Sequence, residues 1–471
     1  MKRSHRVNAV ALAGFTAVTM VVAACSSSGS SKPSSSSALA ASAPGITSSQ
    51  ILIGTHQPLT GVAAPGYDEI AAASNAYFQY VNAHGGIYGR KIAYKILNDQ
   101  YDPTITSTVV HQLVLQDNVF AIFDGLGTPT HLAVVKYLNS SKIPDLFVAS
   151  GCECWNEPST EPYTTGWQID YVREGKILGN YIKQHFAGKK IGYFYQDDEF
   201  GMDGVKGLDD EIPKSQVVAR QSYNPAVTNV APQVTALKAA GAQVVVSFSV
   251  PAFTALLKLT SLKLSFSPQL VVTNVGSDPI TLAGLLESFA KQGGATVAGN
   301  QLTQGIITDG YLPSLGDTSN SWIQLFTKIH SQYLPKLPLD GNVLYGMAVG
   351  YTFVQAMLKA GRNPTRQDLV NAINGGLPQG VAVAPYAYSA TNHAGITGAY
   401  MAVIKNGVLV PTGPTQVTDT TSTGAITTDN AAQPTAPASA RAVRNRSPLT
   451  RPHGDRRTQR DCRIQPQALR G

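Results

Sequence analysis

The sequence predicts an α/β protein of two doubly wound lobes, each a mainly parallel sheet with helices on both faces. Short apolar runs alternate with helical segments from residue 51 to residue 273, at the spacing of strand-helix units. The irregular stretch 151–166 divides these units into two series. Past Gly305 the pattern changes to long helices that end in a hairpin. Together these observations favour two lobes over a single sheet.

The first series opens on the apolar run Ile-Leu-Ile-Gly at Ile51, which is typical of a buried strand. The helix that follows is predicted to end at Gly85-Gly86, a common helix stop. The predicted strands are 51–54, 91–98, 119–123 and 145–149. The predicted helices are 67–83, 103–116 and 129–140.

The second series repeats the pattern, and the last part of the chain closes it. Its predicted strands are 190–195, 217–223, 244–248 and 269–273, and its helices are 171–186, 202–211, 230–240 and 252–262. Helices are then predicted at 319–333, 341–360 and 366–373, with a hairpin of 381–389 and 398–409. Parallel sheets bind ligands beyond the carboxyl ends of their strands, so we expect a cleft between the lobes.

Composition excludes wholesale disorder and argues against nucleic acid as a partner. The chain has 471 residues, is 43% hydrophobic and carries a formal net charge of +7. The basic residues gather at the two ends, with Lys2, Arg3 and Arg6 at the start and nine Arg between residues 431 and 471. The body between these ends is mildly acidic, so it lacks the basic surface that nucleic acids need.

The N-terminus has the pattern of a bacterial lipoprotein. Three basic residues precede the uncharged, mostly apolar stretch 7–24, which ends at Val22-Ala23-Ala24-Cys25 and resembles a lipobox. We expect a signal peptide over 1–24, lipidation of Cys25 and a Ser-rich tether over 25–45. An ordinary cleaved signal is the alternative. Either way the protein is expected outside the cytoplasm, and lipidation would attach it to the cell membrane.

The C-terminal segment 412–471 contains no Phe, Trp or Tyr and passes from Thr/Ala/Pro-rich to Arg-rich sequence. We expect it to be disordered, because it offers little apolar surface to bury. It is either a basic arm that contacts acidic envelope polymers or an extension without a role.

Several motifs carry a resemblance to a known family. They include PLTG at 58–61, VNAHGGIYGRK at 81–91 and YQDDEFG at 195–201, in an order that spans 51–411. This region resembles the branched-chain amino acid (Leu/Ile/Val) type of periplasmic binding protein, the type I solute receptors of ABC importers. The resemblance implies a small-molecule solute, a permease and an ATPase as partners, and no cofactor.

The same resemblance implies how the lobes are assembled. Type I receptors have two lobes joined by a hinge of three chain crossings. Here it assigns 46–165 with 309–398 to lobe I, and 166–308 with 399–411 to lobe II.

Candidate ligand contacts in the first lobe follow two predicted strands. Gly127 and Thr128 precede a helix that opens with proline, so the Thr128 hydroxyl and free N–H groups could hold a carboxylate; a simple N-cap is the alternative. Ala149, Ser150 and Gly151 end the next strand, where the resembling family uses backbone and hydroxyl groups on its ligand.

Aromatic residues supply the other candidate contacts. Gly66 and Tyr67 would bring an aromatic ring over the cleft mouth, or serve helix packing instead. Phe200 matches a position where the family often covers its ligand, or is a core residue. Tyr171 belongs to an aromatic group in the interlobe crossing that suggests a flat ligand, or is hinge packing. Its aromatic members are Trp155, Tyr163, Trp167 and Tyr171, and Gln168 lies among them in the sequence.

The sequence departs from the amino acid binders at one informative place. An amino acid's ammonium group needs a buried anion, because an unpaired buried charge is costly. The family supplies an acid after its last second-lobe strand, whereas residues 273–276 here lack a carboxylate and the next one is Asp278. We therefore expect an amino-acid-like compound, an amide or an organic acid, and not classical leucine or valine binding.

Other chemistry is not expected. Cys152 and Cys154 form either a small disulfide or two free thiols, and too few ligands lie near them for a metal site. The sequence lacks catalytic motifs. Ser150, His56 and Asp99 have the residue types of a catalytic triad, but nothing in the sequence indicates that they lie close together. The protein is thus predicted not to be an enzyme. A lipid-anchored sensor of the same fold, signalling to a membrane partner, is the alternative to an importer subunit.

Overall fold

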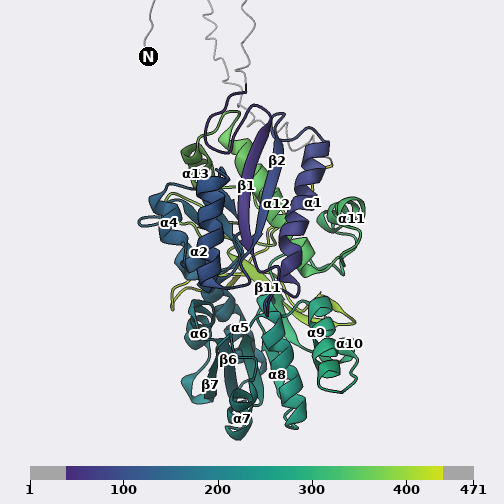
Figure 1. The fold of residues 1–471 in the computed structure, drawn as a ribbon. Coiled ribbons are helices and arrows are strands. Elements are labelled where there is room, and N and C mark those ends of the chain that lie inside the picture. The colour runs from purple at the N-terminus through teal and green to yellow at the C-terminus, as the bar shows by residue number, and fades with distance from the viewer. Residues whose placement is uncertain (1–38, 439–471) are drawn as a thin grey trace, which may run out of the picture. The chain divides into compact units, whose positions relative to one another are not determined.

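The computed structural model describes residues 39–438 (Figure 1). The expected signal peptide, Cys25 and the Arg-rich end of the chain lie outside these residues. The first sheet is fully parallel, in the order β2-β1-β3-β4-β5. Its strands are β1 Gln50–Gln57, β2 Lys91–Asn98, β3 Ile122–Phe123, β4 Asp145–Val148 and β5 Thr164–Gly166.

Helices cover both faces of the first sheet. Figure 1 shows α2 and α4 on one side of β1 and β2, with α1 and α11 on the other. The long helix α12, buried over most of its length, packs on α1 although it comes some 270 residues later in the chain. These helices are η1 Tyr67–Glu69, α1 Ile70–Ala83, α2 Pro103–His111, η2 Gln112–Gln116, α3 Thr128–Leu132, α4 Val135–Ser140, α11 Ser321–Tyr333, α12 Gly341–Ala360 and α13 Arg366–Asn374.

The second sheet has the order β14-β13-β11-β10-β9-β8-β6-β7, with β12 paired to β11. Strands β6 to β10 run parallel and β11 is antiparallel to β10. The strands are β6 Ile191–Gln196, β7 Val217–Tyr223, β8 Val244–Phe248, β9 Gln269–Val272, β10 Ile307–Gly310, β11 Gly398–Lys405, β12 Val408–Pro411, β13 Gln416–Val417 and β14 Thr427–Thr428.

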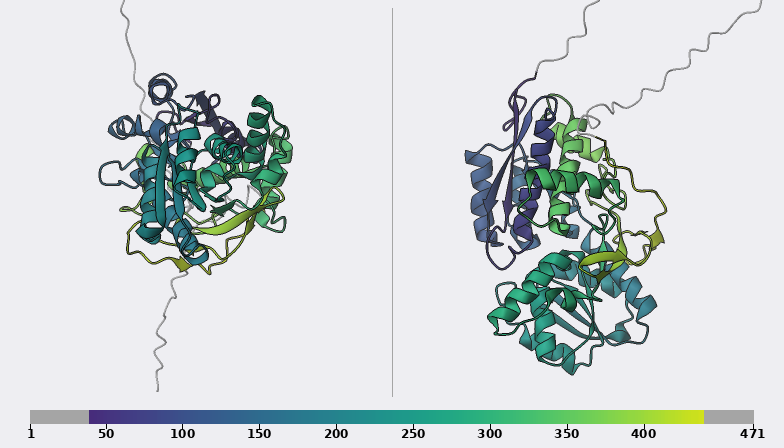
Figure 2. Two further views of the ribbon diagram at one scale, coloured as in Figure 1. Left: turned by 90° about the horizontal axis from the view of Figure 1, so that it is seen from below. Right: turned by 90° about the vertical axis from the view of Figure 1, so that its right-hand side faces the viewer.

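Helices also cover this second sheet (Figure 2). Helices α5 and α6 pack on each other, and α8 packs between α7 and α9. They are α5 Tyr171–His185, α6 Glu199–Glu211, α7 Ala231–Ala239, α8 Pro251–Lys263, α9 Pro279–Gln292 and α10 Gly299–Thr303, with short helices η4 Lys214–Gln216 and η5 Asn274–Gly276. The short helix η3 Glu153–Trp155 instead contacts β5 of the first sheet. Among residues 39–438, no helix is long and apolar enough to cross a membrane.

The predicted hairpin of 381–389 with 398–409 is wrong. Strand β11 turns instead at Asn406-Gly407 and pairs with β12. Both turn residues have positive φ, 52° and 77°, as a two-residue hairpin turn requires, and Asn-Gly is the preferred pair there. Residues 381–389 contribute only isolated bridges, such as Tyr386 to Ile396. The sequence prediction also omitted α9, α10 and β10.

Expected disorder from residue 412 onward is wrong for 412–438. Strand β13 pairs with β11, and Trp322 Nε1 donates to the Pro434 carbonyl at 2.6 Å. The fully buried Lys176 ammonium of α5 donates to three carbonyls of this segment, those of Asp419, Thr421 and Gly424, at 2.6–3.1 Å. Main-chain hydrogen bonds hold this polar segment, and composition does not reveal them.

We predict that a chain truncated after Pro411 melts below one truncated after Ala438. Each charge-assisted hydrogen bond lost from Lys176 is worth about 1.5–3 kcal/mol, and about 1 kcal/mol already shifts Tm by about 2–4 °C in a domain of 150–250 residues. Thermal unfolding of the two truncated proteins, followed by circular dichroism, checks this. Equal melting temperatures would show that the segment adds nothing to stability.

Candidate functional site

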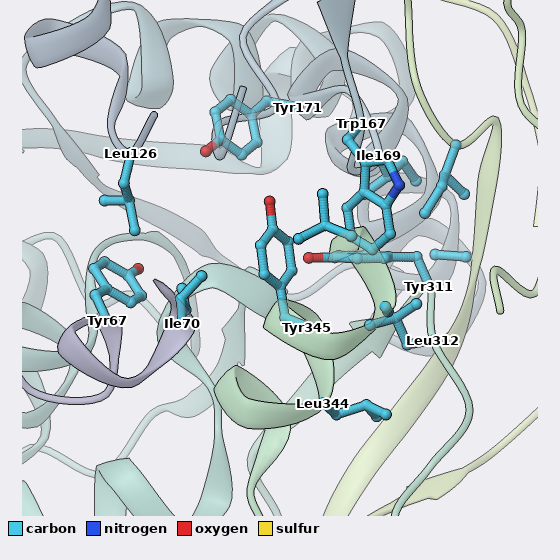
Figure 3. Packing of buried hydrophobic residues seen from close by; sticks show 14 of the residues in the cluster. Tyr67, Ile70, Leu126, Trp167, Ile169, Tyr171, Tyr311, Leu312, Leu344 and Tyr345 are labelled. Atoms are coloured by element: carbon cyan, nitrogen blue, oxygen red, sulfur yellow. The ribbon is translucent and has the colours of Figure 1, made fainter. Parts of the chain in front are cut away.

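A cavity of about 450 Å³ lies between residues that follow strands of both sheets. From the first sheet, Leu126 to Thr128 follow β3 and Ala149 follows β4; from the second, Asn274 follows β9. Figure 3 shows Tyr67, Leu126, Tyr171 and Tyr345 around a common space. This is where parallel α/β sheets place their ligands.

Buried tyrosines form much of the wall. Burial raises the pKa of Tyr67, Tyr311 and Tyr345 well above the ordinary value, so their hydroxyls stay neutral. The Tyr67 hydroxyl donates to the Val275 carbonyl at 2.9 Å, and the Tyr345 hydroxyl donates to Asp124 Oδ1 at 3.4 Å. The cavity is therefore aromatic and hydrogen-bonding without being cationic.

The first-lobe candidates divide into lining and supporting residues. Gly127, Thr128 and Ala149 line the cavity. Ser150 and Gly151 were also predicted as ligand contacts. The structure does not place them among the residues that line the cavity. Ser150 Oγ bonds Thr128 Oγ1 at 2.7 Å, and the Gly151 carbonyl accepts from the Tyr171 N–H at 2.7 Å. Ser150 thus orients the Thr128 hydroxyl, and Gly151 holds the backbone of Tyr171.

Helix α3 offers little dipole at this point. It has only five residues, so its macrodipole is small and the contribution of Thr128 is its hydroxyl. Gly127 has φ 102°, and a Cβ there would lie 2.5 Å from both Thr130 Oγ1 and the Tyr101 ring. Glycine is thus required for the loop to reach the cavity.

Tyr67, Tyr171 and Phe200 also line the cavity, whereas Gly66 only precedes η1, with φ 84°. The rings of Tyr171 and Phe200 are in contact, with centroids 4.7 Å apart. The other aromatic residues of the crossing serve packing: Trp167 is fully buried and donates to Thr352 Oγ1 at 3.0 Å. Of that group, only Tyr171 and Gln168 reach the cavity.

Sequence reasoning missed a buried pair of carboxyls beside the cavity. Glu174 lies in the first turn of α5 and Asp309 in β10, on either side of Asn274. The Asn274 backbone N–H donates to Glu174 Oε1 at 2.8 Å and to Asp309 Oδ1 at 3.1 Å. Thr273 Oγ1 adds a bond of 2.6 Å to Glu174. Asp309, an acid near the end of one further strand, could have indicated this pair, but that strand, β10, was not predicted from the sequence.

Burial disfavours the ionisation of both carboxyls. Burial raises the pKa of Glu174 well above its ordinary value and that of Asp309 to about 6, and their side chains are hydrogen-bonded to each other. Two such groups at close range cannot both ionise cheaply. Of the two carboxyls, Asp309 is the one that lies on the cavity wall.

Comparison with known proteins decides the family. The profile described as periplasmic binding protein matches residues 50–408. The chain belongs to the periplasmic binding protein family. "Leu/Ile/Val-binding protein homolog 3" of Brucella melitensis is 25% identical over 207 residues, 42% of this chain and 54% of that protein. This chain spans about half the length of the curated relatives it matches.

Solved structures share the type I periplasmic binding protein fold. A possible leucine/isoleucine/valine-binding protein from Rhodopirellula baltica superposes with a TM-score of 0.67 at 19% identity, over 78% of this chain and 96% of that one. The fatty acid ABC transporter substrate-binding protein from Thermomonospora curvata gives 0.66 at 22%, over 78% and 93%. The matched proteins are substrate-binding proteins, not enzymes.

The suggested triad does not form in this periplasmic binding protein. His56 Nδ1 does contact Asp99 Oδ2 at 2.7 Å, but His56 Nε2 bonds His131 Nδ1 at 2.9 Å. Ser150 Oγ is bonded to Thr128 instead. Cys152 and Cys154 are joined by a disulfide. Within residues 39–438, no cluster of three or more His, Cys, Asp or Glu is arranged to hold a metal ion.

Polar contacts hold the two lobes of the periplasmic binding protein together. Besides the bond from Tyr67 to Val275, Gln196 Nε2 donates to the Tyr101 hydroxyl at 3.2 Å. The Gly341 N–H of α12 donates to Asp278 Oδ2 of α9 at 2.8 Å. The two lobes are thus in contact in this structure.

Glu69 and Asp340 form a second acidic pair near this contact. Partial burial, followed by the neighbouring Asp340 carboxylate, raises the pKa of Glu69 to about 8 from its ordinary 4.5. Between these values the folded state holds a proton that the unfolded state releases, so stability falls as pH rises.

We predict that Glu69→Gln flattens the decline in stability between about pH 4.5 and pH 8, because the amide removes the titrating group. Urea unfolding at several pH values measures it, with Glu199→Gln on the exposed start of α6 as the matched control. An unchanged pH profile in the Glu69 variant would rule out this contribution.

Proposed function

We propose that this periplasmic binding protein is an extracytoplasmic receptor that delivers a small polar or aromatic organic solute to an ABC importer. Amino-acid-like compounds, amides and organic acids are the candidate classes. The observation that carries the proposal is the cavity of about 450 Å³ walled by residues from both sheets. Its volume falls within the roughly 300–1,000 Å³ of small-molecule sites.

In this proposal the solute's polar head binds Thr128, whose hydroxyl is oriented by Ser150. Tyr171 and Phe200 cover the solute from the second lobe, and Tyr67 closes over it by bonding Val275. A solute that contacts both lobes stabilises the closed form, because it binds that form more tightly than the open one.

The moving parts in this proposal are the two lobes assigned from sequence. Lobe I is 46–165 with 309–398, and lobe II is 166–308 with 399–411. Three crossings between the two sheets act as the hinge, after β5, after β10 and before β11. An ABC permease and ATPase receive the solute from the closed receptor.

The proposal includes a lipid anchor at Cys25. We predict that Cys25→Ser releases the protein from the membrane fraction into the medium, because the serine hydroxyl cannot form the thioether to lipid. Fractionation and immunoblotting of producing cells measure this, with Cys462→Ser as the control that should stay membrane-bound. Retention of the Cys25 variant would refute the anchor.

The solute is found with a thermal-shift panel of amino acids, amides, urea analogues and small aromatic acids on the chain from residue 39 to residue 438. A ligand of the folded state raises its Tm. A panel without any shift would contradict the small-solute receptor. Uptake of the bound solute that is unchanged in a strain lacking the gene would favour the sensor.

For the solute identified, we predict that Thr128→Ala weakens binding about tenfold, the worth of one hydrogen bond to a polar head. Isothermal titration calorimetry measures it, with Thr260→Ala on α8 as the matched control. Unchanged affinity at equal Tm would remove Thr128 from the site.

A further inference from the structure

The cavity has two parts of different chemistry. Its central chamber contains Tyr67, Thr128, Tyr171 and Asn274, which offer hydroxyl and amide groups. Beyond Tyr345 the wall becomes aliphatic, and Figure 3 shows Leu312 and Leu344 there. We call this second part the apolar branch; its leucine and isoleucine residues are Leu312, Leu315, Ile323, Leu339, Leu344 and Leu409.

Two hydroxyl groups of the apolar branch are already used within the protein. The Ser314 hydroxyl donates to the Leu409 carbonyl at 2.5 Å, and the Tyr400 hydroxyl donates to the Leu312 carbonyl at 2.8 Å. Thr318 and Thr327 also line the cavity, and the six leucine and isoleucine side chains offer an occupant carbon surface. Such a surface holds water poorly and favours an alkyl chain.

The charge of the cavity limits the head group. Among the described residues that line it there is no Lys, Arg or His, and the carboxyls are Asp278 and Asp309. Asp278 caps α9 and accepts from the Ile280 and Thr281 N–H groups. A carboxylate in the chamber would face Asp309 with its partner Glu174 and find no cation, which disfavours it strongly.

We propose that the ligand is an amphiphile with an uncharged, hydrogen-bonding head of the primary-amide kind in the central chamber and an alkyl chain in the apolar branch. This inference rests on the proposed function and names the solute class. An amide both donates and accepts, so it matches the Thr128 hydroxyl and the Asn274 side chain without bringing a charge.

The experiment measures the affinity of the wild-type protein for butanamide, hexanamide and octanamide and for the matching carboxylates at pH 7.5. We expect affinity to rise about threefold to fourfold per methylene in the amides, the value of a buried CH₂. We expect each amide to bind at least about tenfold more tightly than its carboxylate. Affinities that are flat with chain length, or stronger for carboxylates, overturn the inference.

Two substitutions fill the apolar branch. Leu315 and Leu339 are only half-buried, so a larger side chain is tolerated there. Leu315→Trp and Leu339→Trp should abolish the gain from hexanamide to octanamide. Leu262→Trp, at an exposed leucine of α8, is the matched control. A gain with chain length that persists in both filled variants places the chain elsewhere and overturns the inference.

The same data separate this inference from the receptor function. Binding of butanamide or of an amino acid with no dependence on chain length overturns the amphiphile and leaves a receptor for a small solute. Failure of every amide, carboxylate and amino acid to bind overturns both.

Discussion

A buried chain of hydrogen bonds between two histidines and two aspartates fixes the first-lobe wall of the cavity. It runs from Asp99 through His56 and His131 to Asp145, with atom separations of 2.7, 2.9 and 2.7 Å. Each imidazole contacts the aspartate on its own side and the other imidazole. Burial lowers the pKa of His56 below its ordinary value, although the contact with Asp99 acts in the opposite direction.

The position of the loop 125–128 depends on this chain of hydrogen bonds. Gly125 passes so close that a Cβ would lie 2.5 Å from His56 Nε2 and 2.8 Å from His131 Nδ1. Because Gly125 has no side chain, the backbone can lie against the imidazoles and carry Leu126 and Thr128 to the cavity. His131 lies in α3, directly after that loop, so the same chain also anchors the helix.

Hydrophobic periodicity predicted most of the fold, because each strand or helix here buries its own local pattern. Strands β2, β7 and β8 and helix α12 have the predicted limits. The predicted hairpin of 381–389 with 398–409 was wrong because Asn406-Gly407 favours a two-residue turn, whereas the prediction relied on a longer polar turn. The prediction of disorder for 412–438 was wrong because backbone carbonyl groups of this segment bind Lys176. Every sequence has such carbonyl groups, so composition does not reveal the contact.

Part of the site could be predicted because its residues follow recognisable strands. Thr128 and Ala149 satisfy that condition and line the cavity. Glu174 does not, since it begins a helix and meets Asp309 only after the second sheet has formed. The search for an acid after β9 therefore found none, although folding brings two carboxyls to the backbone N–H of Asn274.

The two parts of the cavity have separate structural origins. The central chamber is formed by loops at strand ends of both sheets, such as those that carry Thr128 and Asn274. The apolar branch comes from the crossing after β10 and from α11, α12 and β12, segments outside those loops. A change at Leu315 or Leu339 can therefore alter the chain a ligand carries without disturbing the Tyr67 contact that joins the lobes. Receptors of one fold can in this way keep one closing motion and accept solutes of different length.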